Sequence, residues 1–214
     1  MKNEAKKLRD ENNELEKKLK GALNDILTDI VVYIRSYGIS DLDQELVRRD
    51  ITQMLIDGQE RGENAADVIG DDYKAFCDSV MAEIPKLSTK QRIMTSIRDI
   101  LPALMTLFAI WAVFAVIKQV VSNEAWYITP LSVSDVIIGA SLLIAAAGIV
   151  VYITRNSFDA KPAGLICMLL LIIASALAAA LLLPEKIIFS PHIAADMALL
   201  VVLFIAYKLI DRKL

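Results

Sequence analysis

The sequence has little of the chemistry on which most enzymes rely. One histidine, His192, and two cysteines occur among its 214 residues. The sequence also lacks a glycine-rich phosphate-binding loop, a nucleophile elbow and a spaced pair of metal ligands. A single imidazole with scattered carboxylates offers too few ligands for zinc. We therefore expect a protein that is not an enzyme and that carries no cofactor and no metal.

The cysteines and the first residues indicate how the chain is handled in the cell. Cys77 lies in a polar part of the sequence and Cys167 in an apolar run, so a disulfide between them is not expected. Residues 1–18 are densely charged and lack the apolar core of a secretory signal peptide. We expect the first apolar run to direct insertion into a membrane.

Long apolar runs occupy the second half of the sequence. They comprise residues 100–121, 135–153, 163–183 and 192–209. A helix rises about 1.5 Å per residue, so each run is long enough to cross a hydrocarbon core of about 30 Å. The sequence predicts an all-α protein, with an N-terminal cytoplasmic helical domain followed by a four-helix transmembrane bundle at 100–214.

The positive charges predict the orientation of these spans. Those at the ends on one side are Lys86, Lys90, Arg92, Arg98, Arg155, Lys161, Lys208, Arg212 and Lys213. The other side has only Lys118 and Lys186. Because Lys and Arg are retained in cytoplasmic loops, we expect a multi-pass inner (plasma) membrane protein with both termini in the cytoplasm and the lipid bilayer as a partner.

The predicted cytoplasmic domain is acidic. Residues 41–83 hold twelve Asp and Glu against four Lys and Arg, which gives a net charge of −8. A nucleic-acid-binding surface is normally positive, so we expect no nucleic-acid partner. A protein partner with a basic face fits this charge, and a surface that is simply well solvated is the alternative.

The N-terminal segment has an apolar seam at helical spacing. Over residues 4–36 the seam positions, at alternating steps of four and three, are Leu8, Asn12, Leu15, Leu19, Ala22 and Ile26. Such a seam with one core Asn is typical of a parallel coiled coil, which predicts a homodimer through this helix. The alternatives are an amphipathic helix packed on its own domain and a charged tail. We place a coiled-coil-like helix at 1–24, a helical domain at 25–87 and an amphipathic lead-in at 88–99.

Further helices are indicated by caps and breaks. Ser40 or Asp41 caps a helix over 41–57, and Gly58 and Gly62 interrupt the pattern after it. A short helix follows at 65–69, and Asp71 is expected to cap the next helix, which Pro85 closes. Ser88 with Gln91 resembles a capping box for the lead-in. The lead-in is expected either to lie on the membrane surface or to extend the first span.

A family resemblance rests on one stretch of the predicted domain. Residues 55–86 read LIDGQERGENAADVIGDDYKAFCDSVMAEIPK. The positions that match the family pattern are Glu60, Gly62, Gly70, Asp72, Phe76, Cys77 and Asp78. The stretch resembles the bacterial domain-of-unknown-function family numbered 1048, which belongs to the HAAS group of small helical domains. The resemblance implies a cytoplasmic helical domain of a kind that is often fused to membrane helices and encoded beside PadR-type transcriptional regulators. A cytoplasmic transcriptional regulator is therefore one candidate for the expected protein partner, and the resemblance implies no activity.

The motif residues also have a structural interpretation. Gly62 and Gly70 suit turns, and Phe76 and Cys77 suit a core. Asp72 and Asp78 suit helix caps or a solvated surface. A partner-docking role for these residues is the functional alternative. A cation site near Asp72 is not expected, because the acidic residues lack the regular spacing of a calcium loop.

Polar residues near the outer ends of the spans form the second candidate site. Lys118, His192 and Asp196 could together bind an ion or a polar ligand, because ionisable groups are costly in a membrane. A simple helix start at Ser190-Pro191 explains two of them equally well. The runs 135–153 and 163–183 contain no proline and no charge midway, unlike most transport sites. We expect a signalling or regulatory anchor, with a small transporter or accessory subunit of a membrane complex as the alternative.

Overall fold

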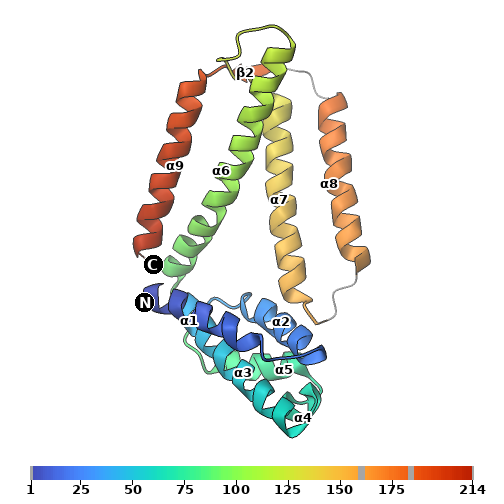
Figure 1. The fold of residues 1–214 in the computed structure, drawn as a ribbon. Helices are drawn as coiled ribbons and strands as arrows, with labels where there is room; N and C mark the ends of the chain where they lie inside the picture. The colour runs from blue at the N-terminus through green and yellow to red at the C-terminus, as the bar shows by residue number, and fades with distance from the viewer. Residues whose placement is uncertain (1, 159–161, 183–185, 214) are drawn as a thin grey trace. The chain divides into compact units, whose positions relative to one another are not determined.

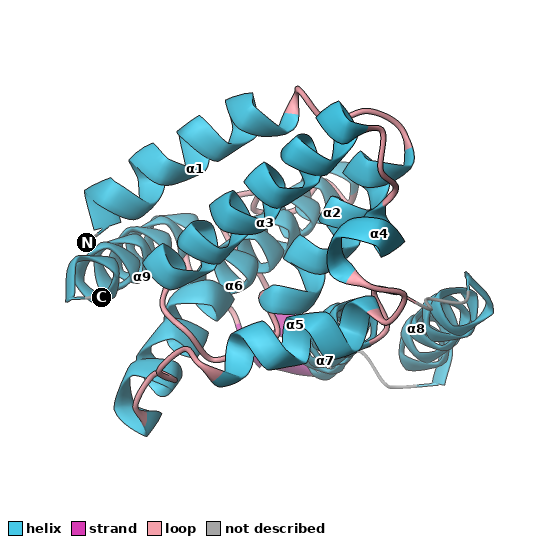
Figure 2. Cartoon of the chain, turned by 90° about the horizontal axis from the view of Figure 1, so that it is seen from below, coloured by secondary structure: helices cyan, strands magenta, loops and turns pink. Residues whose placement is uncertain are grey.

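The computed structural model describes residues 2–158, 162–182 and 186–213. The chain forms two compact units. The first comprises residues 1–90 together with 150–161, and the second comprises residues 91–149 together with 162–214. The described part is all-α apart from two short strands, as the sequence predicts (Figures 1 and 2).

The first unit is built from helices around one apolar core. They are α1 (Lys2–Glu16), α2 (Ala22–Ile34), α3 (Asp41–Arg61), α4 (Ala65–Ile69) and α5 (Tyr73–Ala82). The most deeply buried core side chains come from three of these helices, and they include Leu27, Ile30, Ile34, Ile51, Leu55, Cys77 and Met81. The core therefore joins α2, α3 and α5, which are far apart in the sequence.

The single helix predicted over residues 4–36 is wrong, because the chain turns between α1 and α2. Gly21 has a φ of 54°, which side chains with a Cβ rarely adopt, and it directly precedes α2. Gln59 on α3 fixes the turn through its amide. Its Oε1 accepts a hydrogen bond from the Lys20 N–H at 2.9 Å, and its Nε2 donates to the Lys18 carbonyl at 3.0 Å.

The apolar seam of the N-terminal helix packs against another helix of the same chain. α1 packs along α3, and Leu8, Asn12 and Leu19 are buried there. Figure 2 shows α1 running beside α3. Among the interpretations of the seam, packing on its own domain is the arrangement found. The domain boundary placed after residue 24 falls inside α2.

The helix α3 is longer than expected. Ser40 caps it, accepting a hydrogen bond from the Asp43 N–H at 3.1 Å, and Gly62 ends it with a φ of 76°. Gly58 does not interrupt α3 but lies within it, where an added Cβ would come within 2.3 Å of the Val68 Cγ2 atom. This glycine therefore allows α4 to approach α3 closely.

The short helix predicted at 65–69 is confirmed as α4. Asn64 and Asp67 form a capping box at its start, with both side chain-to-backbone hydrogen bonds at 3.0 Å. The cap of α5 is Asp72 rather than the predicted Asp71, because the Asp72 carboxylate accepts the Ala75 N–H at 2.8 Å. α5 ends at Ala82, before Pro85.

The second unit contains long apolar helices. They are α6 (Thr89–Val121), α7 (Val133–Arg155, whose last residues belong to the first unit), α8 (Pro162–Leu182) and α9 (Ile193–Lys213). Among the described residues, α6, α7 and α9 are long and apolar enough to cross a membrane, and α8 contributes the shorter apolar stretch Ala163–Ala174. The chain therefore has the composition of a membrane protein. The end of the predicted span at 183 and the charge Lys161 lie outside the described residues.

The amphipathic lead-in continues into the first apolar run. α6 runs without a break from Thr89 to Val121, so the lead-in extends that helix. Pro102 lies inside α6 and has no N–H to donate to the preceding turn. The Thr106 hydroxyl donates to the Pro102 carbonyl at 2.9 Å. The lead-in and the apolar run are thus one helix with a weakened turn between them.

Candidate functional site

The strongest side-chain cluster of the first unit surrounds Asp78. Tyr33 lies in the last turn of α2, and Tyr37 follows one helical turn later in the sequence. The Tyr33 hydroxyl donates to Asp78 Oδ1 at 2.8 Å, and the Tyr37 hydroxyl donates to the same oxygen. The Lys74 ammonium lies 3.3 Å from Asp78 Oδ2, one turn earlier on α5. The Asp78 carboxylate therefore accepts hydrogen bonds from two phenols and pairs with one cation.

The hydrogen bonds fix the protonation of this cluster. Those from Tyr37 and then Tyr33 lower the pKa of Asp78, and Lys74 adds to the effect. Burial raises the pKa of Tyr37, and its bond to the Asp78 carboxylate raises it further. At neutral pH the Asp78 carboxylate is charged and the Tyr37 phenol is neutral. The cluster is therefore held together by hydrogen bonds to a charged carboxylate and by the ion pair with Lys74.

Aromatic rings extend the cluster into a small surface, here called the aromatic site and defined as Tyr33, Tyr37 and Tyr73. The Tyr33 and Tyr37 rings meet edge to face, with centroids 5.6 Å apart. Phe158, from the part of the first unit that follows α7, packs against them. Its ring centroid lies 5.3 Å from that of Tyr33 and 6.3 Å from that of Tyr73.

The family-motif residues are not gathered around one point. Gly62 and Gly70 end α3 and α4 with φ values of 76° and 84°, and Asp72 caps α5. Phe76 is half-buried against the core. The Cys77 thiol is fully buried, and burial raises its pKa to about 12.

Asp78 accepts hydrogen bonds from Tyr33 and Tyr37, which lie 45 and 41 residues earlier in the chain. The sequence analysis did not identify these two partners. Their spacing of four residues, which places them on one side of a helical path, was the available signal.

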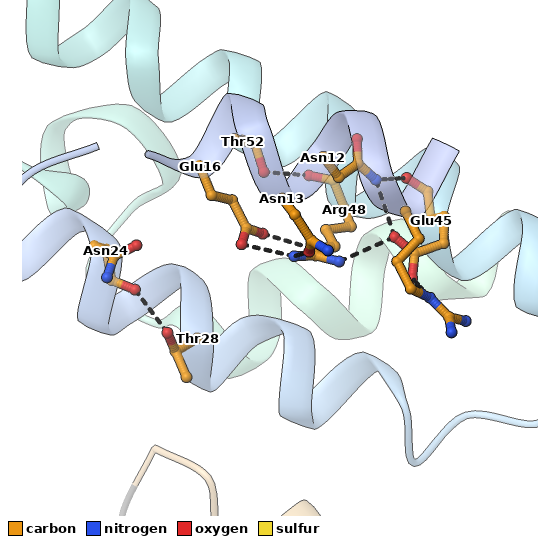
Figure 3. A network of polar contacts seen from close by, with 9 residues as sticks. Asn12, Asn13, Glu16, Asn24, Thr28, Glu45, Arg48 and Thr52 are labelled. Atoms are coloured by element: carbon orange, nitrogen blue, oxygen red, sulfur yellow. Dashed lines mark hydrogen bonds and ion pairs between the residues drawn. The ribbon is translucent and has the colours of Figure 1, made fainter. Parts of the chain in front are cut away.

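A second polar cluster joins α1 to α3 (Figure 3). Arg48 lies at its centre and binds Glu45 at 3.1 Å and Glu16 at 2.6 Å. Asn12 donates to both the backbone carbonyl and the carboxylate of Glu45, at 2.9 and 3.0 Å. The bond to Glu16 raises the pKa of Arg48. These hydrogen bonds join α1 to α3, and the Asn12 Oδ1 atom is buried without a partner among the described residues, so we interpret the cluster as a structural network that specifies how α1 packs.

Two residues of the predicted membrane cluster, Asp196 and His192, have different partners among the described residues. Asp196 is buried in the first turn of α9, and its carboxylate accepts a hydrogen bond from the Thr129 hydroxyl. His192 precedes α9; its Nδ1 accepts the Ala194 N–H at 3.1 Å, and its ring packs on Tyr127. Lys118 is exposed in the last turn of α6. No group of metal ligands is found among the described residues.

The residues around Asp196 join the connection between α6 and α7 to the connection between α8 and α9. β1 (Leu131–Ser132) pairs antiparallel with β2 (Ile187–Phe189). The Thr129 N–H donates to the Pro191 carbonyl at 3.0 Å, and the Ile193 N–H donates to the Tyr127 carbonyl at 2.9 Å. Asp196 thus fastens the connection after α6 to the start of α9, a structural role that the sequence interpretation did not foresee.

Comparison with known proteins adds no relative. No family model, no curated protein and no solved structure matches this chain.

Proposed function

We propose that this protein is a signalling or regulatory anchor of a bacterial inner membrane, and that its cytoplasmic helical domain docks a protein partner. The observation that carries the proposal is the contrast between the units. The first unit buries its apolar side chains in a core of its own, whereas large apolar side chains of the second, such as Phe114 at 66% and Leu171 at 69%, are exposed. Lipid covers such side chains in a membrane protein.

In this proposal α8 is a fourth span beside α6, α7 and α9. Its range, Pro162–Leu182, corresponds to the apolar run at 163–183. The positive residues that flank the runs favour cytoplasmic placement of both termini. The resemblance to the HAAS group supports the same placement for the helical domain, and it suggests a transcriptional regulator as the partner.

A docking face is available on α3. Leu46, Asp50 and Met54 are spaced by four residues and so share one side of the helix. Leu46 is 44% exposed and Met54 is 40% exposed. Two apolar contacts with a carboxylate between them suit a partner whose basic residue lies within an apolar patch.

The described contacts give less support to the homodimer and transporter interpretations. A homodimer through the N-terminal seam needs Asn12 and Leu19, which are already buried within the chain. A transporter or accessory subunit that uses Asp196 needs its carboxylate, which already binds Thr129. Both observations favour the docking proposal.

The test is crosslinking of the full-length protein in its native membrane, followed by mass spectrometry of what it captures. We compare wild type with the double variant Leu46→Ser/Asp50→Arg. Asp10→Arg, on the exposed part of α1, is the control for the charge change. We expect the double variant to lose a cytoplasmic partner by about tenfold, the equivalent of about 1.4 kcal/mol. The control retains the partner. Capture of membrane subunits only, unchanged in both variants, contradicts the proposal.

A further inference from the structure

The segment that follows α7 belongs to the first unit. α7 ends at Arg155, and the Asn156 amide closes its last turn by donating to the Tyr152 carbonyl at 2.9 Å. Ser157 and Phe158 follow and are partly buried. Phe158 packs against the core residues of the first unit, as do Tyr37 and Tyr73. This short segment therefore presents one ring to the aromatic site.

Of the two rings that contact Phe158, that of Tyr33 is held in place by polar contacts. Asp78 fixes the Tyr33 and Tyr37 hydroxyls, and Lys74 lies 6.0 Å from the Tyr33 ring centroid on the rim. Rings oriented in this way lose little conformational freedom when a further ring packs on them. An aromatic surface whose rings are already oriented, with one further ring packed on it, resembles a binding site occupied by its ligand.

The residue that precedes Phe158 opposes burial of the segment. The Ser157 hydroxyl is buried without a hydrogen-bond partner among the described atoms, which opposes burial of this segment. The ring contacts of Phe158 must outweigh that cost. Phe158 therefore supplies the favourable ring contacts of the described part of this segment.

We propose that the aromatic site is a recognition site for one aromatic side chain on a short segment, and that Phe158 is its internal ligand. The ligand class is a peptide with Phe or Tyr at a turn after a helix. Such a peptide, offered as a separate molecule, binds the site once Phe158 is removed. The proposal concerns a different surface from the docking face on α3 and does not rest on it.

The first experiment places the photoreactive residue p-benzoylphenylalanine at position 158 of the full-length protein in its native membrane. We expect adducts on the peptides that contain Tyr33 or Tyr73. The same residue at Phe189, which is 62% exposed, is the control and gives none of these adducts. Adducts of position 158 with lipid or with other proteins alone overturn the proposal.

The second experiment measures binding of labelled peptides to full-length protein in lipid nanodiscs. One peptide has the sequence of residues 152–158, and the other has Ala in place of Phe158. We expect the Phe158→Ala protein to bind the first peptide at least about tenfold more tightly than the second, because ring burial and ring contacts are both lost. The Ser157→Ala protein, a matched control, binds neither peptide better than wild type does. Equal binding of the two peptides to the Phe158→Ala protein overturns the proposal.

Discussion

Asp78 accepts a hydrogen bond from Tyr37, and this contact fastens α5 to the segment that follows α2. The same carboxylate oxygen also accepts the Tyr33 hydroxyl. Two phenols that donate to one oxygen favour the charged carboxylate and lower the pKa of Asp78. The packing of α2 on α5 therefore depends on the ionisation of a single, partly exposed side chain.

Replacing Asp78 with Asn weakens this packing. The amide oxygen is a poorer acceptor, and the ion pair with Lys74 disappears. Because Asp78 is partly exposed, we expect a loss of about 1 kcal/mol in the free energy of opening the first unit. Hydrogen exchange of the α2 and α5 amides measures it, with Asp67→Asn at the α4 cap as the control. No faster exchange in α2 would show that the contact does not hold the helices together.

The pH dependence of stability follows from the same pair. The pKa of Asp78 is lower in the folded state, so its contribution is complete above about pH 5 and is lost as the pH falls through the lowered pKa. The pKa of Tyr37 is raised, so its contribution is complete below about pH 10 and is lost above it. Hydrogen exchange of the α2 and α5 amides, measured as a function of pH, should show a loss of stability at both acidic and alkaline pH. The Asp78→Asn variant should show a shallower acid limb.

Arg48 and Arg49 are neighbours with opposite expected effects. Arg48 is buried and pairs with partly buried Glu16 and buried Glu45, so Arg48→Ala leaves Glu16 without this cation and Glu45 with Arg9 alone, at a cost of about 3 kcal/mol. Arg49 pairs with Glu11 on the surface at 3.4 Å, and Arg49→Ala costs about 0.5 kcal/mol or less. Exchange of the α1 and α3 amides measures both. Equal costs would mean that the buried network does not position α1.

Gly58→Ala tests the close approach of α4 to α3. The added methyl group meets the Val68 side chain, which has little rotational freedom, so we expect a loss of about 1–3 kcal/mol. Val68→Ala in the same chain should restore part of that loss by removing the clash. Thermal unfolding followed by protease sensitivity of the α3–α4 connection measures it. A Gly58→Ala protein as stable as wild type would contradict the geometry.

Thr129 and Asp196 test the structural interpretation of the membrane cluster. Asp196→Asn keeps an oxygen that accepts the Thr129 hydroxyl, so it should leave the connection intact. Thr129→Val removes the donor and leaves a buried carboxylate unpaired, at a cost of about 1–3 kcal/mol. Protease accessibility of residues 122–132 compares the two variants. Loss of cellular function in Asp196→Asn with an intact connection would instead support the transport interpretation.

Local signals in the sequence were sufficient for several elements. The α4 helix and its stop at Gly70 depend on contacts a few residues apart and were predicted correctly, and the observed cap Ser40 was one of the two caps predicted for α3. The break at Gly21 was not predicted, because the apolar spacing continues across it while the backbone does not. The cap of α5 was misplaced by one residue, because adjacent aspartates have the same capping chemistry.

Contacts between distant parts of the chain lay beyond the sequence pattern. α3 buries charged Glu45 and Arg48 on the side that faces α1, so hydrophobic periodicity does not mark that side. The Tyr33–Asp78 bond joins residues 45 positions apart, and the four-residue spacing of Tyr33 and Tyr37 does not identify so distant an acceptor. The strands β1 and β2 are two and three residues long, so only their pairing defines them. Propensity cannot predict such pairs.

The burial of Cys77 has a practical consequence for kinetics. Its thiol is fully buried and remains protonated at neutral pH, so an alkylating reagent reaches it only when the core of the first unit opens. The alkylation rate of Cys77 therefore reports how often that core opens in the intact protein. Peptide mapping separates this signal from the exposed Cys167. The chain thus contains a native chemical probe of its own opening rate, and no engineered label is needed.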